Sequence, residues 1–547
     1  MRPRLPAIAL SGVLLLGTAG ALAQAEAERR LDAAIERLRG ALGPEARIEI
    51  GSRRLDPVTG RATLTDIVIR RGGDRIAIPE AILSDLSDTR IGRAELRGVS
   101  ERGADGTRAE TGRVLLSGLA LPPAGKTPTP AAIAFDSLGI EDIRGAAEGV
   151  KVTVTRLALL DWRDLGLGAG VLEGFHYQAA DGEAFRLGRI TLESVALPFT
   201  GPDFAPANFR AGRIAVEAVA LQAPAQGGEA TLDRLELRNW APGLLASLML
   251  DGLRGAGQVQ NLGATAFTLA RAEVSGIDAA GTVEALLAGR QPPDPRPGQP
   301  QRLALEGFES QAEGQPLLAL TRLLNEWTLE GGIAAATLRL DGFRLTLPRG
   351  DAAALEALGY REIAGGVETR ASLPRAGGRL EIDPLRITWD EAATLAFTAQ
   401  LDGVPPLSEA GAAVKQDATM LALTESRLAG LTLTLRDQGL MGRVIAQQAR
   451  TQRIQPARLR EQWAQMALAL PVPGANPRAN PHANPHANPG ADPFLPVRQA
   501  LAAFIRQPGT LEIALRPKVP VPLVELPLAL ADPAGTALRL GLTATAR

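Results

Sequence analysis

The chain repeats one ten-residue pattern, most clearly in Gly188-Arg-Ile-Thr-Leu-Glu-Ser-Val-Ala-Leu197 and Gly212-Arg-Ile-Ala-Val-Glu-Ala-Val-Ala-Leu221. Related copies begin at Gly92 and Gly112, and a copy without the leading glycine occupies residues 231–238. Apolar and polar residues alternate in each copy, as they do in a strand with one dry face and one wet face. We therefore predict that each copy is a strand that starts at a turn glycine, and that a proline ends several of them.

Other segments alternate in the same way, at residues 61–70, 151–157, 379–383 and 431–436. The 59 glycines and 40 prolines also favour turns over long helices. The spacing between copies is irregular, which argues against a solenoid of identical repeats. The predicted fold is mainly β with short helices (β-rich α+β), an elongated array of antiparallel hairpins forming a long twisted sheet or groove.

Helical spacing of leucines predicts short helices between the strands. We expect them at residues 242–251, 281–290, 316–327 and 351–358, in two stretches of 439–470 with the second starting at Pro456, and at 495–506. The chain is predicted to close with strands at 510–515, 526–530 and 538–543.

The N-terminus is typical of a secretory signal. A basic start, Met1-Arg-Pro-Arg4, precedes an apolar run and the small-x-small triplet Ala21-Leu-Ala23, which predicts cleavage before Gln24 and export to the periplasm by the Sec route. The alternative is an uncleaved inner-membrane anchor, because the apolar run is almost long enough to span a bilayer.

The predicted organisation has five parts, and the last contains an insertion. They are a signal peptide (1–23), an amphipathic helix (24–43), a repeated-hairpin β region (44–290), a Pro-rich linker (291–300) and a C-terminal β-rich region with helices (301–547) that contains a disordered Asn-Pro repeat loop (475–493).

Composition excludes several functions. The chain has 59 basic and 60 acidic residues, so it lacks the positive field that non-specific nucleic-acid binding needs, and we expect no nucleic-acid partner. It has no cysteine, which removes disulfides, thiolate metal sites and cysteine nucleophiles. Its scarce tyrosine and tryptophan also argue against a sugar-binding cleft.

Motifs for chemistry are weak. Ala120-Leu-Pro-Pro-Ala-Gly-Lys-Thr127 resembles a phosphate-binding loop, but prolines follow where a helix is needed. Gly166-Leu-Gly-Ala-Gly170 is predicted to be a turn, and Asp390-Glu391 a hairpin turn.

Three histidines are present, and none has an evident partner. His482 and His486 lie in the repeat loop, and His176 lies in a strand-like stretch. We therefore assign no catalytic, cofactor-binding or metal-binding residue and expect no cofactor.

One set of apolar residues could line a groove. These are Leu192, Val195, Ile214, Val216 and Val219, on the apolar side of two repeated strands. The same residues could equally be ordinary core positions of a sandwich.

The C-terminal third resembles a known group of envelope proteins. The resemblance rests on the order of Leu358-Gly-Tyr360 and residues 380–389, 431–443, 457–463, 511–517 and 519–522. This order is similar to that of YdgA-like bacterial envelope proteins of unassigned function and, more loosely, to the AsmA-like group, over residues 352–546. The resemblance implies a signal or anchor, a long β-rich periplasmic body and no known cofactor. AsmA-like proteins are associated with outer-membrane biogenesis and with phospholipid movement along elongated apolar grooves. The expected cleavage site and the Asn-Pro insertion depart from the YdgA-like pattern.

The sequence therefore predicts a non-enzymatic periplasmic envelope protein. It would act as a scaffold or handle lipid or another hydrophobic ligand along a β-groove, with lipid or envelope proteins as partners and an inner-membrane tether if the signal is retained. One alternative is an envelope hydrolase, with His176 as its best candidate. Another is an interaction module that pairs through exposed strand edges.

Overall fold

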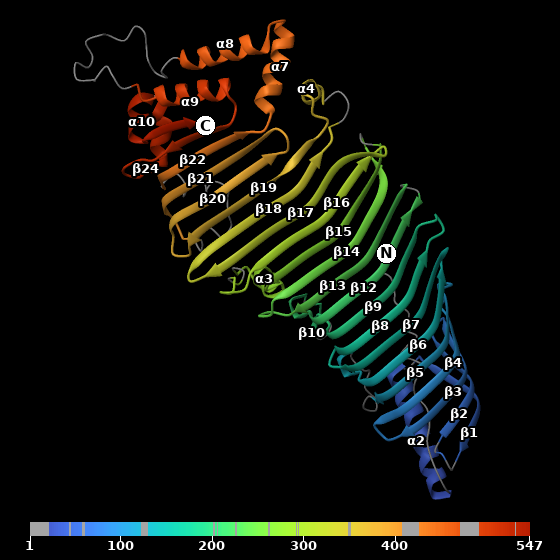
Figure 1. Cartoon of the computed structure of the whole chain (residues 1–547). Coiled ribbons are helices and arrows are strands. Elements are labelled where there is room, and N and C mark those ends of the chain that lie inside the picture. The colour runs from blue at the N-terminus through green and yellow to red at the C-terminus, as the bar shows by residue number, and fades with distance from the viewer. Residues whose placement is uncertain are drawn as a thin grey trace. The chain divides into compact units, whose positions relative to one another are not determined.

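The alternating segments form long antiparallel strands, as seen in a computed structural model of the chain (Figure 1). The structure describes residues 21–547 except 43–44, 57–58, 60, 122–129, 201–202, 205, 225–226, 261–262, 291–292, 294, 348–351, 407–425, 471–491 and 531. Two compact units are present: unit 1 contains residues 1–266 and 277–293, and unit 2 contains 267–276 and 294–547. Most of the predicted signal peptide, of the phosphate-loop resemblance and of the Asn-Pro loop lies outside the described residues.

In its described part, unit 1 consists of one helix, then consecutive strands, and a second helix at its end. Its elements are α2 (Ala21–Leu42), β1 (Arg47–Asp56), β2 (Arg61–Arg71), β3 (Asp74–Leu86), β4 (Arg90–Arg102), β5 (Arg108–Ala120), η1 (Pro130–Ala132), β6 (Phe135–Ala147), β7 (Val150–Arg163), β8 (Gly166–Gln178), β9 (Ala184–Ala196), β10 (Phe199–Thr200), β11 (Asp203–Phe204), η2 (Pro206–Asn208), β12 (Arg210–Ala223), β13 (Gly228–Trp240), β14 (Ala246–Val259) and α3 (Ala279–Leu287). The strand β15 (Gly263–Ile277) is divided between the units.

Unit 2 continues with strands and ends in a group of helices. Its elements are β16 (Gln301–Ala312), β17 (Gln315–Glu330), β18 (Ile333–Leu345), α4 (Ala353–Ala357), β19 (Ile363–Pro374), β20 (Gly378–Trp389), β21 (Ala393–Val404), β22 (Arg427–Asp437), α7 (Leu440–Gln452), α8 (Pro456–Leu468), α9 (Leu495–Arg506), β23 (Thr510–Leu515), β24 (Val521–Pro522), η4 (Leu523–Leu530), α10 (Pro533–Arg539) and β25 (Leu542–Ala546).

All described strands except β10 and β11 belong to one open antiparallel sheet of 23 strands. This confirms the predicted fold class. In unit 1 each strand pairs with the next along the chain, and β9 pairs with β12 across the short β10–β11 hairpin. In unit 2 the same meander runs from β16 to β22, after which β22 pairs with β23 and β24, and β23 pairs with β25.

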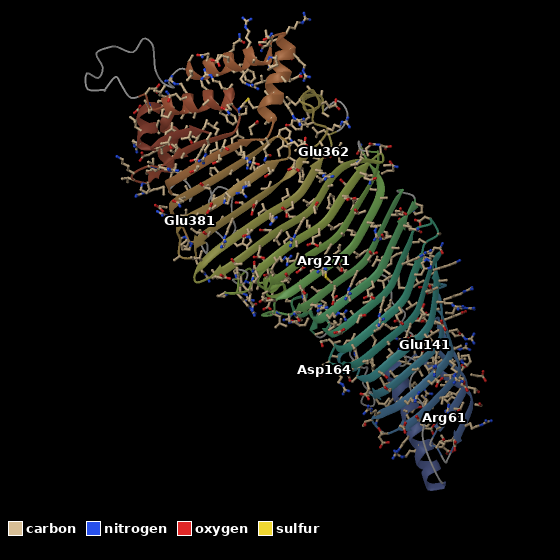
Figure 2. The ribbon with its side chains drawn as sticks, viewed as in Figure 1. Arg61, Glu141, Asp164, Arg271, Glu362 and Glu381 are labelled. Atoms are coloured by element: carbon tan, nitrogen blue, oxygen red, sulfur yellow. The ribbon has the colours of Figure 1, made fainter. Side chains whose placement is uncertain are left out.

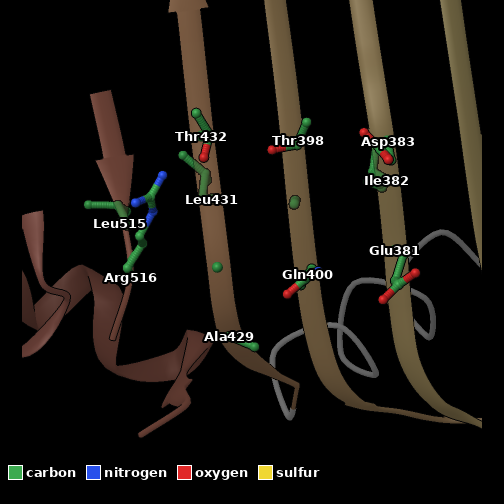
Figure 3. Close-up of a pocket in the computed structure, with 12 residues that line it drawn as sticks. Glu381, Ile382, Asp383, Thr398, Gln400, Ala429, Leu431, Thr432, Leu515 and Arg516 are labelled. Atoms are coloured by element: carbon green, nitrogen blue, oxygen red, sulfur yellow. The ribbon is translucent and has the colours of Figure 1, made fainter. Parts of the chain in front are cut away.

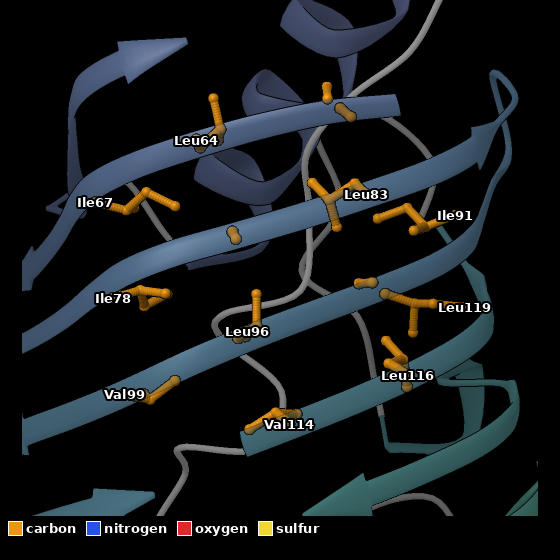
Figure 4. Close-up of a cluster of buried hydrophobic side chains, with 14 of the residues drawn as sticks. Leu64, Ile67, Ile78, Leu83, Ile91, Leu96, Val99, Val114, Leu116 and Leu119 are labelled. Carbon is orange, nitrogen blue, oxygen red and sulfur yellow. The ribbon is translucent and has the colours of Figure 1, made fainter. Parts of the chain in front are cut away.

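The largest core lies between α2 and the first strands. Leu31, Ala34 and Ile35 of the helix pack into one buried cluster with aliphatic residues of β2 to β6 (Figure 4). The helical spacing of residues 31, 35, 38 and 42 predicted this apolar stripe, although the helix starts at Ala21, three residues before the predicted start.

Two lines of left-handed residues cross the strands of unit 1. One line contains Asp66, Gly98, Asp142, Gly174, Ala218 and Gly252, and the other contains Asp85, Gly118, Asp161, Ser194 and Asn239, all with φ between 52° and 68°. Each line has such a residue in every second strand, which is typical of bulges that increase twist. Beside each one, two successive side chains point to the same face, as Glu217 and Ala218 do between Val216 and Val219.

These lines correct the prediction for the repeat glycines. Gly92, Gly112, Gly188 and Gly212 lie inside strands and not at turns, because each sits opposite a left-handed residue of the neighbouring strand. A Cβ at Gly188, for example, would lie 2.8 Å from the Cβ of Ala218. The glycine is therefore required by close approach of the two strands.

Gly92→Ala is expected to destabilise the protein by about 1–3 kcal/mol, the usual cost of overpacking. Its new methyl group would lie 2.6 Å from the backbone oxygen of Asp85, which cannot move aside without shifting β3. The control is Gly145→Ala in β6, where the nearest atoms lie 3.9 Å away. Urea denaturation of both variants checks this, and equal midpoints would contradict it.

Two predicted helices are wrong. Residues 242–251 form a turn and the start of β14, and residues 316–327 lie within β17. In β17 the leucines are spaced as in a helix because Gly342 of β18, a left-handed residue, lies against Thr321, so that Leu320 and Leu323 on its two sides share one face. Hydrogen bonding to strands on both sides then outweighs the helical propensity of leucine.

Three further predictions are corrected. Residues 526–530 lie in η4 and not in a strand, and residues 538–543 are split between α10 and β25. Residues 166–170 begin β8, because the turn is made just before them by Asp164 and Leu165, both with positive φ. The predicted helices at 281–290, 351–358, 439–470 and 495–506, the start at Pro456 and the turn at Asp390-Glu391 are confirmed within a few residues.

Candidate functional site

One face of the unit 1 sheet carries an apolar row from β2 to β14. A single cross-strand row contains only aliphatic residues on eleven successive strands: Leu64, Ala81, Leu96, Val114, Ile140, Leu157, Leu172, Ile190, Val216, Leu235 and Leu250. Neighbouring strands therefore present their dry faces in register, as direct cross-strand pairs.

Solvent exposure changes along this row. Its first five residues, on β2 to β6, are at most 5% exposed because α2 packs over them. Its last six, on β7 to β14, are all partly exposed. Near them Leu221 and Leu248, on the same face, are 46% and 40% exposed. The uncovered part of the row, from Leu157 to Leu250, is thus about 24 Å long at the usual spacing between strands.

The five residues predicted to line a groove lie on this face. Leu192 pairs with Ile214, while Val216 pairs with Ile190 and Val219 with Leu187, across the β9–β12 ladder. Val195 is buried in a small cluster with Leu167 and Ala211, against which Leu192 and Ile214 pack. The structure therefore brings all five to one face, where they are partly or fully buried.

Aromatic residues lie along both margins of the apolar face. At one margin Phe135 stacks on Trp162 at 6.2 Å and Phe209 approaches Trp240 at 6.5 Å, measured between ring centroids. At the other, Phe175 and Phe185 meet edge to face at 5.9 Å. Between the margins the central row is aliphatic. Trp and Tyr at the edge of an aliphatic band are typical of surfaces that meet both hydrocarbon and water.

Unit 2 has an apolar row of its own. It contains Leu305, Leu323, Leu340, Val367, Ile387, Leu395, Leu435, Leu511 and Ala546, on nine successive strands. Here α9 covers the end of the row, where Phe504 packs against Leu435 and Leu511. Ile387 and Leu395, on the next strands, are 43% and 37% exposed. In each unit, therefore, a helix covers one end of the apolar row.

The opposite face carries ordered charges. Beside the first line of left-handed residues, ion pairs join Arg113 to Glu141 (4.0 Å) and connect Glu173 with Arg156 and Arg189 (3.8 and 3.7 Å). Figure 2 shows Glu141 with the other side chains of this unit. These pairs are exposed, so each contributes little to stability, but their charges keep this face solvated.

Among the described residues of this face, Glu236 of β13 is the one carboxylate that is almost fully buried, at 1% exposed. Its Oε1 accepts hydrogen bonds from Nε of Arg213 (2.6 Å) and Nε of Arg238 (2.7 Å), and its Oε2 accepts one from Arg234. Burial raises the pKa of Glu236, but the hydrogen bonds and charges of these arginines outweigh burial and lower it to about 2.

Glu236→Gln is expected to destabilise the fold at neutral pH by about 2–3 kcal/mol, allowing for screening of the half-exposed arginines. A carboxylate with a lowered pKa stabilises the fold above its ordinary pKa of 4.5, and this contribution disappears as pH falls toward 2. The difference from wild type should therefore close between pH 4.5 and 2. Urea titrations at several pH values measure it. Glu193→Gln, at a 48% exposed side chain, is the control; a pH-independent difference would contradict the account.

In the described part of the chain, no histidine is hydrogen-bonded to a carboxylate or hydroxyl. His176 lies on β8 opposite Thr153 and Arg186, and no described carboxylate or hydroxyl is hydrogen-bonded to its imidazole. The described residues also contain no group of three or more His, Asp or Glu that could hold a metal ion. His482 and His486 lie outside the described residues.

A pocket of about 380 Å³ lies against β20 to β23 (Figure 3). Glu381 and Asp383 line it together with the hydroxyls of Thr398 and Thr432. Among the described residues, neither hydroxyl is hydrogen-bonded to a carboxylate that would activate it as a nucleophile. The pocket can hold a small polar molecule.

No helix among the described residues combines the length and the apolar character needed to cross a bilayer.

The fold and the site define a class: an open antiparallel β-sheet protein with one charged face and one partly uncovered apolar face. A model of a family described as "Uncharacterized protein" matches residues 386–547, which extend from β20 to the end of β25. No curated protein shows significant sequence similarity to the chain. The matched region holds α7, α8 and α9 but less than a third of the chain.

Sequence reasoning found five residues of the apolar face and missed the rest, including the whole row of unit 2. Their signal was a spacing of three, then two, then three residues, as in Leu187, Ile190, Leu192 and Val195. This is the period of a strand interrupted by a bulge at each three-residue step. Glu236 could be suspected from its place between Arg234 and Arg238, but Arg213 is brought to it only by the β12–β13 register.

Proposed function

We propose that this chain is a non-enzymatic envelope protein that binds lipid acyl chains on the uncovered part of its apolar face. The observation that supports this is the aliphatic row from Leu157 to Leu250, partly exposed on six successive strands. Exposed apolar patches of this kind usually mark interaction sites.

The composition of the row favours hydrocarbon over a protein partner. Protein interfaces carry about one hydrogen bond per 100–200 Å², whereas the side chains of this row offer no donor or acceptor. An acyl chain needs none, and each buried methylene contributes about 0.8 kcal/mol. The uncovered row, about 24 Å long, exceeds the depth of one bilayer leaflet, about 15 Å. A lipid chain can therefore lie along it with its polar end at an aromatic margin.

The two alternatives have less support. Pairing through exposed strand edges is disfavoured at β1, where Arg47, Arg53 and Arg54 are exposed, because edge charges oppose pairing. A hydrolase requires an activated nucleophile, and the described residues present none at His176 or in the pocket of Figure 3. A periplasmic location, the YdgA-like or AsmA-like resemblance and a tether through a retained signal are part of this proposal and rest on the sequence.

Mass spectrometry of the protein isolated without detergent tests the proposal. We expect phospholipid or fatty acid to co-purify at one or more molecules per chain. The delipidated protein should bind a fluorescent fatty acid. Repeated absence of both bound lipid and fatty-acid binding would overturn it.

A further inference from the structure

Positive charge is concentrated in the helical layer of unit 2. Together with Arg453, the helices α7, α8 and α9 contain seven arginines and one glutamate: Arg443, Arg450, Arg453, Arg458, Arg460, Arg498, Arg506 and Glu461. The layer has a formal charge of +6, so the rest of the chain carries −7, because the whole chain carries −1. The near-zero net charge of the whole chain therefore includes one strongly basic region.

Four of these arginines are used within the fold. Arg443 bonds to Glu391 and the carbonyl of Gly359, and its guanidinium lies over the ring of Tyr360. Arg450 bonds to the carbonyl of Ala357. Arg498 pairs with Asp492, and Arg506 with Glu461.

The other three lie close together in sequence, where α7 ends and α8 begins. Arg453 and Arg458 are exposed, and Arg460 is half-buried with an Nε that makes no hydrogen bond. Within the described part of the chain, no carboxylate pairs with any of them. Unlike the four arginines used within the fold, these three guanidinium groups are therefore available to bind an anion.

Apolar side chains lie beside them. A hollow of about 650 Å³ is lined by Arg458, Leu459, Trp463, Met466 and Ala469 along one side of α8. Met466 is 58% exposed, and Leu470, just beyond the helix, is 48% exposed. Basic and exposed apolar residues side by side on a surface helix are typical of elements that lie in the headgroup region of a membrane.

We propose that the α7–α8 corner binds the surface of an anionic phospholipid bilayer. Arg453, Arg458 and Arg460 contact lipid phosphates, and Met466 and Leu470 enter the boundary of the acyl region. Guanidinium groups bind phosphate oxygens in a bidentate manner. The exposed apolar pair distinguishes this surface from a nucleic-acid site, which would need stacked aromatic rings or a longer basic stripe. This surface shares no residue with the apolar sheet face, and the proposal does not depend on lipid binding at that face.

Co-flotation of the full chain with vesicles tests the proposal. We expect binding to phosphatidylcholine vesicles that contain 30% phosphatidylglycerol, weaker binding at high salt, and little binding to phosphatidylcholine alone. Each arginine near an anionic surface contributes about a fivefold gain in affinity. The variant Arg453→Glu/Arg458→Glu/Arg460→Glu should therefore lose at least about a hundredfold.

The matched control reverses three exposed arginines elsewhere, with Arg61→Glu, Arg71→Glu and Arg75→Glu in β2 and β3. It changes the net charge equally and should bind like wild type. Thermal melts confirm that both variants fold. Equal binding by both variants, or no binding by wild type, would overturn the proposal.

A second measurement reports insertion. Because the chain has no cysteine, Met466→Cys gives a unique site for an environment-sensitive dye. We expect a blue shift on adding phosphatidylglycerol vesicles and none with a DNA oligonucleotide. A shift with DNA alone, or none with the vesicles, would contradict membrane binding. This surface can fail its test while the sheet still carries lipid, so the two proposals are distinguishable.

Discussion

Replacing Ile190, Val216 and Leu235 together by glutamate is expected to abolish lipid binding. These residues occupy one row on the adjacent strands β9, β12 and β13. A carboxylate beneath an acyl chain would have to lose its hydration without gaining a partner, which is strongly unfavourable. The affinity for a fluorescent fatty acid should fall at least about a hundredfold, or by more than about 2.7 kcal/mol.

The control places the same three charges on the opposite face, through Thr153→Glu, Thr191→Glu and Thr231→Glu. Thr191 lies beside Ile190 in sequence but faces the charged side, opposite Ala215 and Val171. This variant should retain fatty-acid binding. All three apolar positions are partly exposed, so the sheet should tolerate the first variant; circular dichroism checks that it folds. Loss of binding in both variants would argue against a one-sided site.

Phe504→Ala is expected to destabilise unit 2 by about 3–5 kcal/mol, the usual cost of truncating a buried phenylalanine. Phe504 is 2% exposed and packs against Leu435, Met441, Leu511 and Ile513, so it holds α9 on the end of the sheet. The loss should appear as faster amide exchange in β23 and β25, because local stability depends on this contact.

Leu495→Ala in the same helix is the control for Phe504→Ala. Leu495 is 42% exposed, and its truncation should cost less than about 1 kcal/mol. Hydrogen exchange and urea midpoints are measured on the full chain for both variants. Equal exchange in β23 for Phe504→Ala and wild type would show that α9 is not held by this residue.

Much of the fold follows from the alternation of residues. The alternation at 61–70 and 431–436 predicted β2 and β22, and in β2 the apolar positions are buried on both sides of the bulge at Asp66. The prediction failed in β17. Leu320 and Leu323 have helical spacing in sequence but share one face of β17 across a bulge, so neither a strand nor a helix pattern is regular there.

The candidate site was predictable only in part. The dry side of each strand can be read from its own residues, as for Leu192 and Ile214. The alignment of those dry sides into one row depends on the register of every hairpin, which is set by the bulges and turns. Where α2 ceases to cover the row also depends on tertiary packing, since the sequence shows only that the helix has an apolar stripe.

The environment of Glu236 could also be predicted only in part from the sequence. Its neighbours Arg234 and Arg238 are evident in the sequence, but many carboxylates of this chain lie near arginines. Only the pairing of β12 with β13 adds Arg213 and buries the group. A lowered pKa therefore could not be assigned from the sequence.

The most direct test of acyl binding on the apolar face is photo-crosslinking in intact cells. A photoreactive amino acid is placed at Leu235, on the apolar row, or at Thr231 on the charged face of the same strand. Mass spectrometry of the purified protein then identifies what is attached. We predict lipid adducts at Leu235 and none at Thr231. Protein adducts alone at Leu235, or lipid adducts at both positions alike, would contradict a lipid-binding apolar face.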